Sequence, residues 1–188
     1  MRGIRWRGKM AITWILLIYV VPSEPSRKRA YIWREIKKVG AVYLRDGVCA
    51  LPERAETTAA FQRIAAKVEE FGGEATLVEA AHLDPQRAEM LTTASQTARA
   101  GEYGELSGEA EGFLAHVRRE TEHRAFTFAE LEELEEDLGK LTRWTGQVRA
   151  RDYFGGADAE AVTALLARCE EELAVFLETA AREDEVHP

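Results

Sequence analysis

The sequence predicts an α+β protein, in which a small domain of strands and helices precedes an acidic bundle of helices. Three observations predict it. Residues 12–21 form a continuous apolar run rich in β-branched and aromatic side chains, which is typical of a buried strand. Two short apolar runs then flank an Asp-Gly pair, with a helical pattern on either side. From residue 84 onward, apolar residues recur only at helical spacing.

The first helix is predicted from about residue 25 to residue 39. Ser23 is suited to cap it, and Pro25 fits its first turn. Gly40 ends the pattern. The side chains expected on its apolar face are Ala30, Trp33, Ile36 and Val39.

Residues 41–44 and 48–51 are two short strands joined at Asp46-Gly47, a strong hairpin signal. A helix then runs to about Phe71, and residues 74–83 are read as a last strand. The predicted order is therefore β-α-β-β-α-β, which is the ferredoxin-like motif.

The second part begins at Asp84, an N-cap residue followed by proline. Gly101, Gly104 and Gly108 suggest a break in the helix that follows. Two later helices each carry an apolar seam close to heptad spacing, and we expect them to form an antiparallel hairpin packed on the helix before it. The seam residues are Leu131, Leu134, Leu138, Leu141 and Val148 in the first, and Val162, Leu165, Cys169, Leu173, Phe176 and Ala180 in the second. Thr127 with Glu130 fits a capping box at the start of the first, Gly155-Gly156 turns the chain, and Asp158 is expected to cap the second.

The predicted organisation is a basic arm over residues 1–11, a ferredoxin-like domain over 12–83 and a helical bundle over 84–188. The charge of the side chains also differs between the beginning of the chain and the rest. Residues 1–45 hold eleven Lys/Arg and two Asp/Glu, whereas the remainder holds fourteen and thirty-one. Such a division predicts either two surfaces with different partners or attraction between the two parts.

The apolar run near the N-terminus is too short to span a bilayer and lacks a signal-peptide cleavage site. We therefore expect a cytoplasmic protein without a membrane partner. Cys49 and Cys169 lack metal-ligand spacing and fall on predicted core faces, where free cysteine is a small apolar residue. Redox sensing or pairing is the alternative.

The first candidate site is the start of the first helix, where hydroxyl groups, backbone N–H groups and cations come together. This combination suits a tetrahedral oxyanion or a nucleic-acid phosphate, and the alternative is a capped helix with a solvated basic face. The predicted oxyanion- or nucleic-acid-binding residues are Ser23, Ser26, Arg27, Lys28, Arg29, Arg34, Lys37 and Lys38. Trp6, between two arginines of the arm, is the aromatic residue free to stack on a base, because Trp33 falls on the predicted core face. A disordered arm without such a role is the favoured interpretation.

Secondary candidates are Arg149, Arg151 and Asp152, near a predicted helix C-terminus. Helix capping with a local ion pair is favoured there over contact with an oxyanion. His116, Glu120 and His123 share one helix face and, with Glu130 or Glu133, could approach a metal ion. An acidic chain produces such spacings readily, so we predict a solvated face, no metal site and no cofactor.

Several segments resemble the N-terminal domain of the ChrB family of chromate-resistance regulatory proteins. They are residues 14–19, 22–29, 40–48, 51–52, 126–130 and 151–154, with Trp33 and Trp144. More distantly, the first of these segments are similar to the middle domain of PaaX-type repressors and to small CRISPR-adaptation nucleases. Those nucleases carry a metal-binding carboxylate just after the tyrosine of the first strand, whereas Tyr19 here is followed by two valines.

No serine-hydrolase, zinc-protease, P-loop or dinucleotide motif is present, so catalysis is not expected. The resemblance implies a regulatory protein of chromate resistance that binds DNA or a partner through the basic helix, with chromate or another oxyanion as an effector. We expect a homodimer, because related domains are dimeric. The alternative is an interaction module that binds a separate protein and no DNA.

Overall fold

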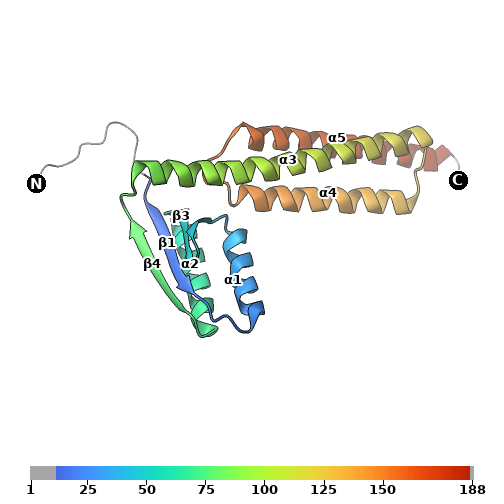
Figure 1. Ribbon diagram of the computed structural model, residues 1–188. Helices are drawn as coiled ribbons and strands as arrows, with labels where there is room; N and C mark the ends of the chain where they lie inside the picture. The colour runs from blue at the N-terminus through green and yellow to red at the C-terminus, as the bar shows by residue number, and fades with distance from the viewer. Residues whose placement is uncertain (1–11, 187–188) are drawn as a thin grey trace, which may run out of the picture. The chain divides into compact units, whose positions relative to one another are not determined.

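The computed structural model describes residues 12–186, which fall into two compact units that meet between residues 95 and 96 (Figure 1). The division between the units falls within one helix. The predicted division into residues 12–83 and 84–188 stays a prediction, and the predicted basic arm with Trp6 lies outside the described residues.

The first unit contains a four-stranded antiparallel sheet with the strand order β2-β3-β1-β4. Its elements are β1 (Trp14–Val20), α1 (Ser26–Lys38), β2 (Val42–Arg45), β3 (Val48–Pro52), α2 (Ala55–Glu70) and β4 (Glu74–Ala80). In the centre of the sheet, Leu17 of β1 is paired with Cys49 on one side and Leu77 on the other. The predicted α+β class is confirmed.

The β2–β3 turn depends on Gly47, whose φ is +71°. A Cβ atom there would lie 2.6 Å from the carbonyl oxygen of Tyr19. A hydrogen bond holds the two backbone segments together at this point: the Tyr19 N–H donates to the Gly47 carbonyl over 2.8 Å. Glycine is thus required both for the backbone angle and for the contact with β1.

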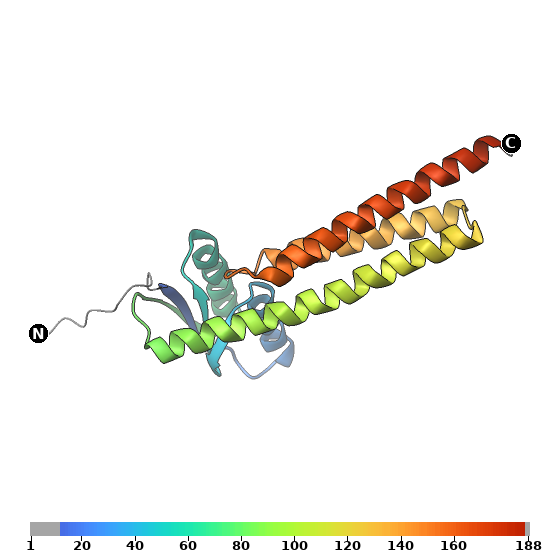
Figure 2. The same ribbon diagram turned by 90° about the horizontal axis from the view of Figure 1, so that it is seen from above.

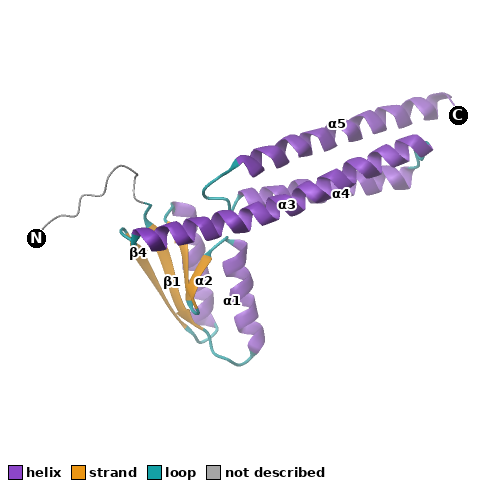
Figure 3. Ribbon diagram, turned by 45° about the horizontal axis from the view of Figure 1, so that its top comes forward, coloured by secondary structure: helices purple, strands orange, loops and turns teal. Residues whose placement is uncertain are grey.

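Helices α1 and α2 cover the same face of this sheet (Figure 3). The side chains buried in this unit include Ile15, Leu17, Ile32, Ile36, Cys49, Leu51, Phe61, Ile64 and Val68. Full burial of each large apolar side chain stabilises the fold by roughly 1.5–3 kcal/mol.

Two expectations for α1 are wrong. Its buried residues are Ile32 and Ile36, and Trp33 is 53% exposed. The i, i+4 pair of isoleucines determines which face is buried, and Trp33 lies outside it. The N-cap residue is Pro25, with no side-chain capping bond, so Ser23 does not cap the helix.

The second unit contains residues 96–123 of α3 (Pro85–His123), together with α4 (Phe128–Arg149) and α5 (Ala157–Val186). Figures 1 and 2 show the three helices running alongside one another. Their core includes the predicted seam residues Leu134, Leu141 and Val148 of α4, and Val162, Cys169, Leu173 and Phe176 of α5. The rings of Phe126 and Phe176 lie 5.1 Å apart.

The predicted break in α3 is wrong, because the helix is continuous through Gly101, Gly104 and Gly108. Each glycine costs a helix about 1 kcal/mol. Burial of Tyr103, Leu106 and other side chains of the same face compensates for that cost. Tertiary packing therefore overrides the local preference.

Helix starts agree with the sequence at two places and disagree at a third. The Asp84 carboxylate accepts from the Gln86 N–H over 2.8 Å, and the Thr127 hydroxyl accepts from the Glu130 N–H over 3.3 Å. Asp158 lies in the first turn of α5 and not at its cap, because the helix already begins at Ala157.

Over residues 12–186, no helix is both long and apolar enough to cross a membrane.

Candidate functional site

The outer face of α1, which we define as Arg27, Arg29, Trp33, Arg34 and Lys37, is exposed along its length. Burial of the two isoleucines turns these residues away from the core. Lys37 lies over the indole, with Nζ 5.7 Å from the ring centroid of Trp33. The face thus combines four cations with one large aromatic surface.

Besides Lys37, two of the eight predicted binding residues have partners within the unit. Lys28 Nζ donates to the Phe71 carbonyl over 3.0 Å and lies 5.4 Å from the centroid of its ring. Lys38 Nζ forms an ion pair with Glu35 at 2.6 Å. Lys28 therefore holds the end of α2, and only the other predicted cations remain on the outer face. Ser23 and Ser26 are exposed at the start of α1.

Tyr31, Phe71 and Lys67 form a surface cluster that the sequence did not indicate. The Tyr31 and Phe71 rings meet edge to face at 5.6 Å, and Lys67 Nζ lies 5.0 Å from the Phe71 centroid. These contacts join α1 to α2. They fix the position of α1, and with it the direction of its outer face.

The secondary candidates of the second unit form a network with α3. Arg151 donates from Nε and Nη2 to the Glu102 carboxylate, over 3.2 and 2.8 Å. Arg99 Nε lies 2.8 Å from the same carboxylate, within ion-pair distance but out of line for a hydrogen bond. Arg99 also donates to the Arg151 carbonyl over 3.5 Å. One carboxylate is therefore the ion-pair partner of two partly buried arginines.

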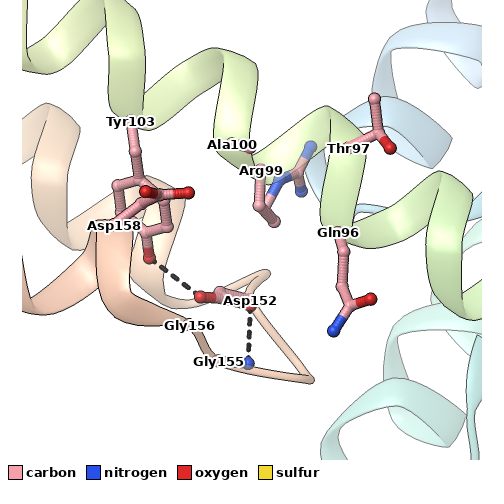
Figure 4. Close-up of a pocket in the computed structure, with 9 residues that line it drawn as sticks. All are labelled: Gln96, Thr97, Arg99, Ala100, Tyr103, Asp152, Gly155, Gly156 and Asp158. Atoms are coloured by element: carbon pink, nitrogen blue, oxygen red, sulfur yellow. Dashed lines mark hydrogen bonds between the residues drawn. The ribbon is translucent and has the colours of Figure 1, made fainter.

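Asp152 completes this network, as Figure 4 shows. Its carboxylate accepts from the Tyr103 hydroxyl over 3.1 Å and from the Gly155 N–H over 2.9 Å. Burial, followed by the bond to Asp152, raises the pKa of Tyr103 to about 12. The same bonds fix the turn between α4 and α5.

A pocket of about 310 Å³ lies beside this network, lined by Arg99, Tyr103, Asp152 and Asp158 among others (Figure 4). The charged side chains of the lining are two carboxylates and one guanidinium, so the net charge of the pocket is not positive. Arg151 is engaged with Glu102, and Arg149 is exposed. This arrangement favours the local structural role of Arg151 and Asp152 over contact with an oxyanion.

The predicted histidine–carboxylate group is brought together only in part. His116, Glu120 and Glu130 converge between α3 and α4, whereas His123 is exposed and does not join them. A second set around His116 contains Glu133 and Asp137. Asp137 was missed from the sequence, although it follows Glu133 by four residues and therefore lies on the same face of α4.

Both cysteines are fully buried, as predicted. Burial raises the pKa of Cys49 to about 12, and it also raises the pKa of Cys169. A thiol of this kind is a poor nucleophile at neutral pH. Their burial in the two cores agrees with the interpretation as small apolar residues.

The chain thus consists of an α+β unit and a helical unit. The outer face of α1, which is cationic and aromatic, holds the largest group of predicted site residues. Residues 29–186 match the family described as "Protein ChrB, N-terminal". The chain belongs to this family, and the resemblance found in the sequence is confirmed. A segment of 74 residues is 32% identical to Protein ChrB of Cupriavidus metallidurans (strain CH34). That match covers 39% of this chain but only 23% of the relative. No solved structure matches the chain.

Proposed function

We propose that this chain is a non-catalytic regulatory module of chromate resistance that binds DNA through the outer face of α1. Membership of the ChrB family supports the association with chromate resistance and with regulation. The observation that carries DNA binding is the exposed Trp33 among Arg27, Arg29, Arg34 and Lys37.

Trp33 is 53% exposed, Lys37 lies over its ring, and Arg34 is exposed on the same helix. Cations neutralise phosphates, and an exposed indole can stack on a base or pack against a sugar. Ile32 and Ile36 hold the helix from its other side, so the face is presented on a fixed element. A cationic face on a fixed helix supports contact with a phosphate backbone.

The experiment is binding of the purified chain to its own promoter DNA across a salt series, with and without chromate. We expect log affinity to fall linearly with log salt, by roughly 0.9 for each phosphate neutralised. The double variant Arg27→Glu with Arg34→Glu should lose binding. Lys28 is left unchanged, because its loss would disturb the contact with Phe71.

A matched control carries the same change of charge elsewhere in the first unit. Arg63 of α2 and Arg87 of α3 are both exposed, and Arg63→Glu with Arg87→Glu should retain most of the affinity. Equal loss in both double variants would mean that only net charge matters. Absence of binding at low salt would reject DNA as the ligand.

The second candidate is an interaction module that binds a separate protein through the same face. The exposed indole favours it as well, because aromatic residues and arginine are the commonest anchors of protein interfaces. Co-purification of a partner that Trp33→Ala releases, without any retardation of DNA, would favour this function.

The finer features of the module belong to the same proposal. The order β2-β3-β1-β4 supports a ferredoxin-like domain, and such domains pair readily, so we propose a homodimer. We place the protein in the cytoplasm, with chromate or a similar oxyanion as effector. Sedimentation equilibrium tests the dimer, and chromate-dependent change in DNA affinity tests the effector.

A further inference from the structure

A histidine and two carboxylates from different helices surround one point between α3 and α4. His116 and Glu120 lie four residues apart and therefore on one face of α3. Glu130 comes from the first turn of α4. The ligand atoms of all three residues lie within 4.8 Å of one another.

The distances within this group are longer than hydrogen bonds. His116 Nε2 lies 3.6 Å from Glu120 Oε1 and 3.8 Å from Glu130 Oε2. A hydrogen bond between these atoms would be about 2.7–3.2 Å long. In a tetrahedral site with metal–ligand bonds of about 2.0–2.2 Å, neighbouring ligand atoms are roughly 3.3–3.6 Å apart. The two distances from His116 need to shrink by only a few tenths of an ångström, and the carboxylate oxygens of Glu120 and Glu130 lie within 4.8 Å of each other.

The donor set is one imidazole with two carboxylates, and two more carboxylates lie near. Glu133 and Asp137 form a second triad with the same histidine. Nitrogen and oxygen donors of this kind suit Zn²⁺, Mn²⁺ or Fe²⁺, whereas an all-oxygen set would suit Ca²⁺ or Mg²⁺. Helical bundles commonly build metal sites from side chains on facing helices.

Local structure holds the ligands in place. Glu120 is buried, and its neighbours Phe113 and Val117 on α3 belong to the core. The Thr127 cap fixes the start of α4, where Glu130 lies. Preorganised ligands on rigid elements reduce the cost of binding an ion.

Charge in the group favours a divalent cation. Glu120 and Glu130 bring two negative charges, and Glu120 also accepts a hydrogen bond of 2.8 Å from exposed Arg119. A carboxylate oxygen accepts more than one partner, so this bond and a metal bond are compatible. Asp137 is already paired with Lys140 over 3.1 Å, so the charge that an ion would balance is that of Glu120, Glu130 and the nearby Glu133.

The group is open to an incoming ion. A pocket of about 410 Å³ borders it, lined by His116, Asp137, Trp144 and other residues of α3 and α4. The pocket gives a path to the histidine and leaves room for a water or small ligand at a fourth position. The sequence alone already suggested Glu130 or Glu133 as partners of His116 and Glu120. It favoured a solvated face, because an acidic chain produces such spacings readily.

We propose that His116, Glu120 and Glu130 bind a divalent transition-metal ion, with Glu133 or Asp137 available as a further ligand. The site lies in the helical unit and is separate from the residues of the outer face of α1. Metal binding and DNA binding can therefore be tested one without the other.

The test is titration of the full, chelator-treated chain with Zn²⁺ by calorimetry, and with Co²⁺ by visible absorption. We expect one ion per chain and a higher melting temperature in its presence. His116→Ala and Glu130→Gln should each weaken the affinity about ten-fold or more. Glu130 is only half-buried, so Glu130→Gln keeps the test valid even where His116→Ala perturbs folding.

His123→Ala is the matched control, because His123 lies on the same helix, is exposed and does not join the group. It should leave affinity and stoichiometry unchanged. Three results overturn the proposal: no binding of either ion, equal loss in the His123 variant, or affinity that survives both His116→Ala and Glu130→Gln.

Discussion

Arg151 makes a two-pronged contact with Glu102, which lies forty-nine residues earlier in the chain. The contact joins the end of α4 to α3, and its two side chains are 16% and 26% exposed. Because Arg99 shares the same carboxylate, loss of Glu102 leaves two guanidinium groups without their counter-charge. This network connects two helices by charge where the apolar seams end.

Replacement of Arg151 by alanine should lower the free energy of unfolding by about 2 kcal/mol, because two charge-assisted hydrogen bonds are lost. Arg149→Ala, two residues earlier and exposed, should change it by less than about 0.5 kcal/mol. Urea denaturation followed by circular dichroism measures both. Equal stability of the two variants would contradict a stabilising role for the contact.

Tyr103 should make stability depend on pH in the alkaline range. Burial and the bond to Asp152 raise its pKa from 10.0 to about 12, so the folded state keeps the neutral phenol. The unfolded chain releases this proton near pH 10, and the stabilisation present below that pH is lost between about pH 10 and pH 12. Linkage limits the loss to roughly 2–3 kcal/mol.

The measurement is denaturation of the native protein and of Tyr103→Phe from pH 8 to pH 12. Other groups also titrate in this range, and comparison of the two proteins removes their contribution. The stability of the Phe variant should fall less steeply. Parallel curves would show that Tyr103 does not retain its proton.

Gly104 and Gly47 should respond to alanine in opposite directions. Gly104 is exposed in the middle of α3, and a Cβ atom there would meet nothing within 4 Å. Gly104→Ala should therefore stabilise by about 0.5–1 kcal/mol. Gly47→Ala should destabilise by more than that, because of its positive φ and the nearby Tyr19 carbonyl. Thermal melts of both variants test the pair, and destabilisation by Gly104→Ala would contradict the continuous helix.

Neither cysteine should react with a thiol reagent in the native protein. Both are fully buried, and burial raises the pKa of each thiol. Modification should become complete only in denaturant. Rapid labelling of one thiol in the native state would mean that its core opens readily, and it would revive the redox interpretation.

Trp33→Ala should weaken DNA binding by about 1–3 kcal/mol without changing the salt dependence, because stacking releases no counterions. Arg34→Glu should instead reduce the slope of log affinity against log salt by about one. Both residues are exposed, so both variants should fold normally. If both variants had the same slope of log affinity against log salt, Arg34 would not contact a phosphate.

The sequence predicted what depends on spacing along one element. The heptad pattern identified Leu134, Leu141 and Val148 as core residues, and Asp46-Gly47 identified the hairpin. The sequence placed Trp33 on the buried face wrongly, because the apolar residues of α1 fit two overlapping helical spacings. Only packing against the sheet decides which of the two faces is buried. The bond from Arg151 to Glu102 depends on how α3 and α4 are aligned, which no local pattern records.

The two buried isoleucines of α1 have a consequence for how this chain can change. Ile32 and Ile36 secure the helix from beneath, whereas the outer face contributes little to the core. Substitutions on that face can therefore accumulate without loss of folded protein. Ligand preference and folding are encoded by different residues of one helix, and a lineage can alter the first while the second stays intact.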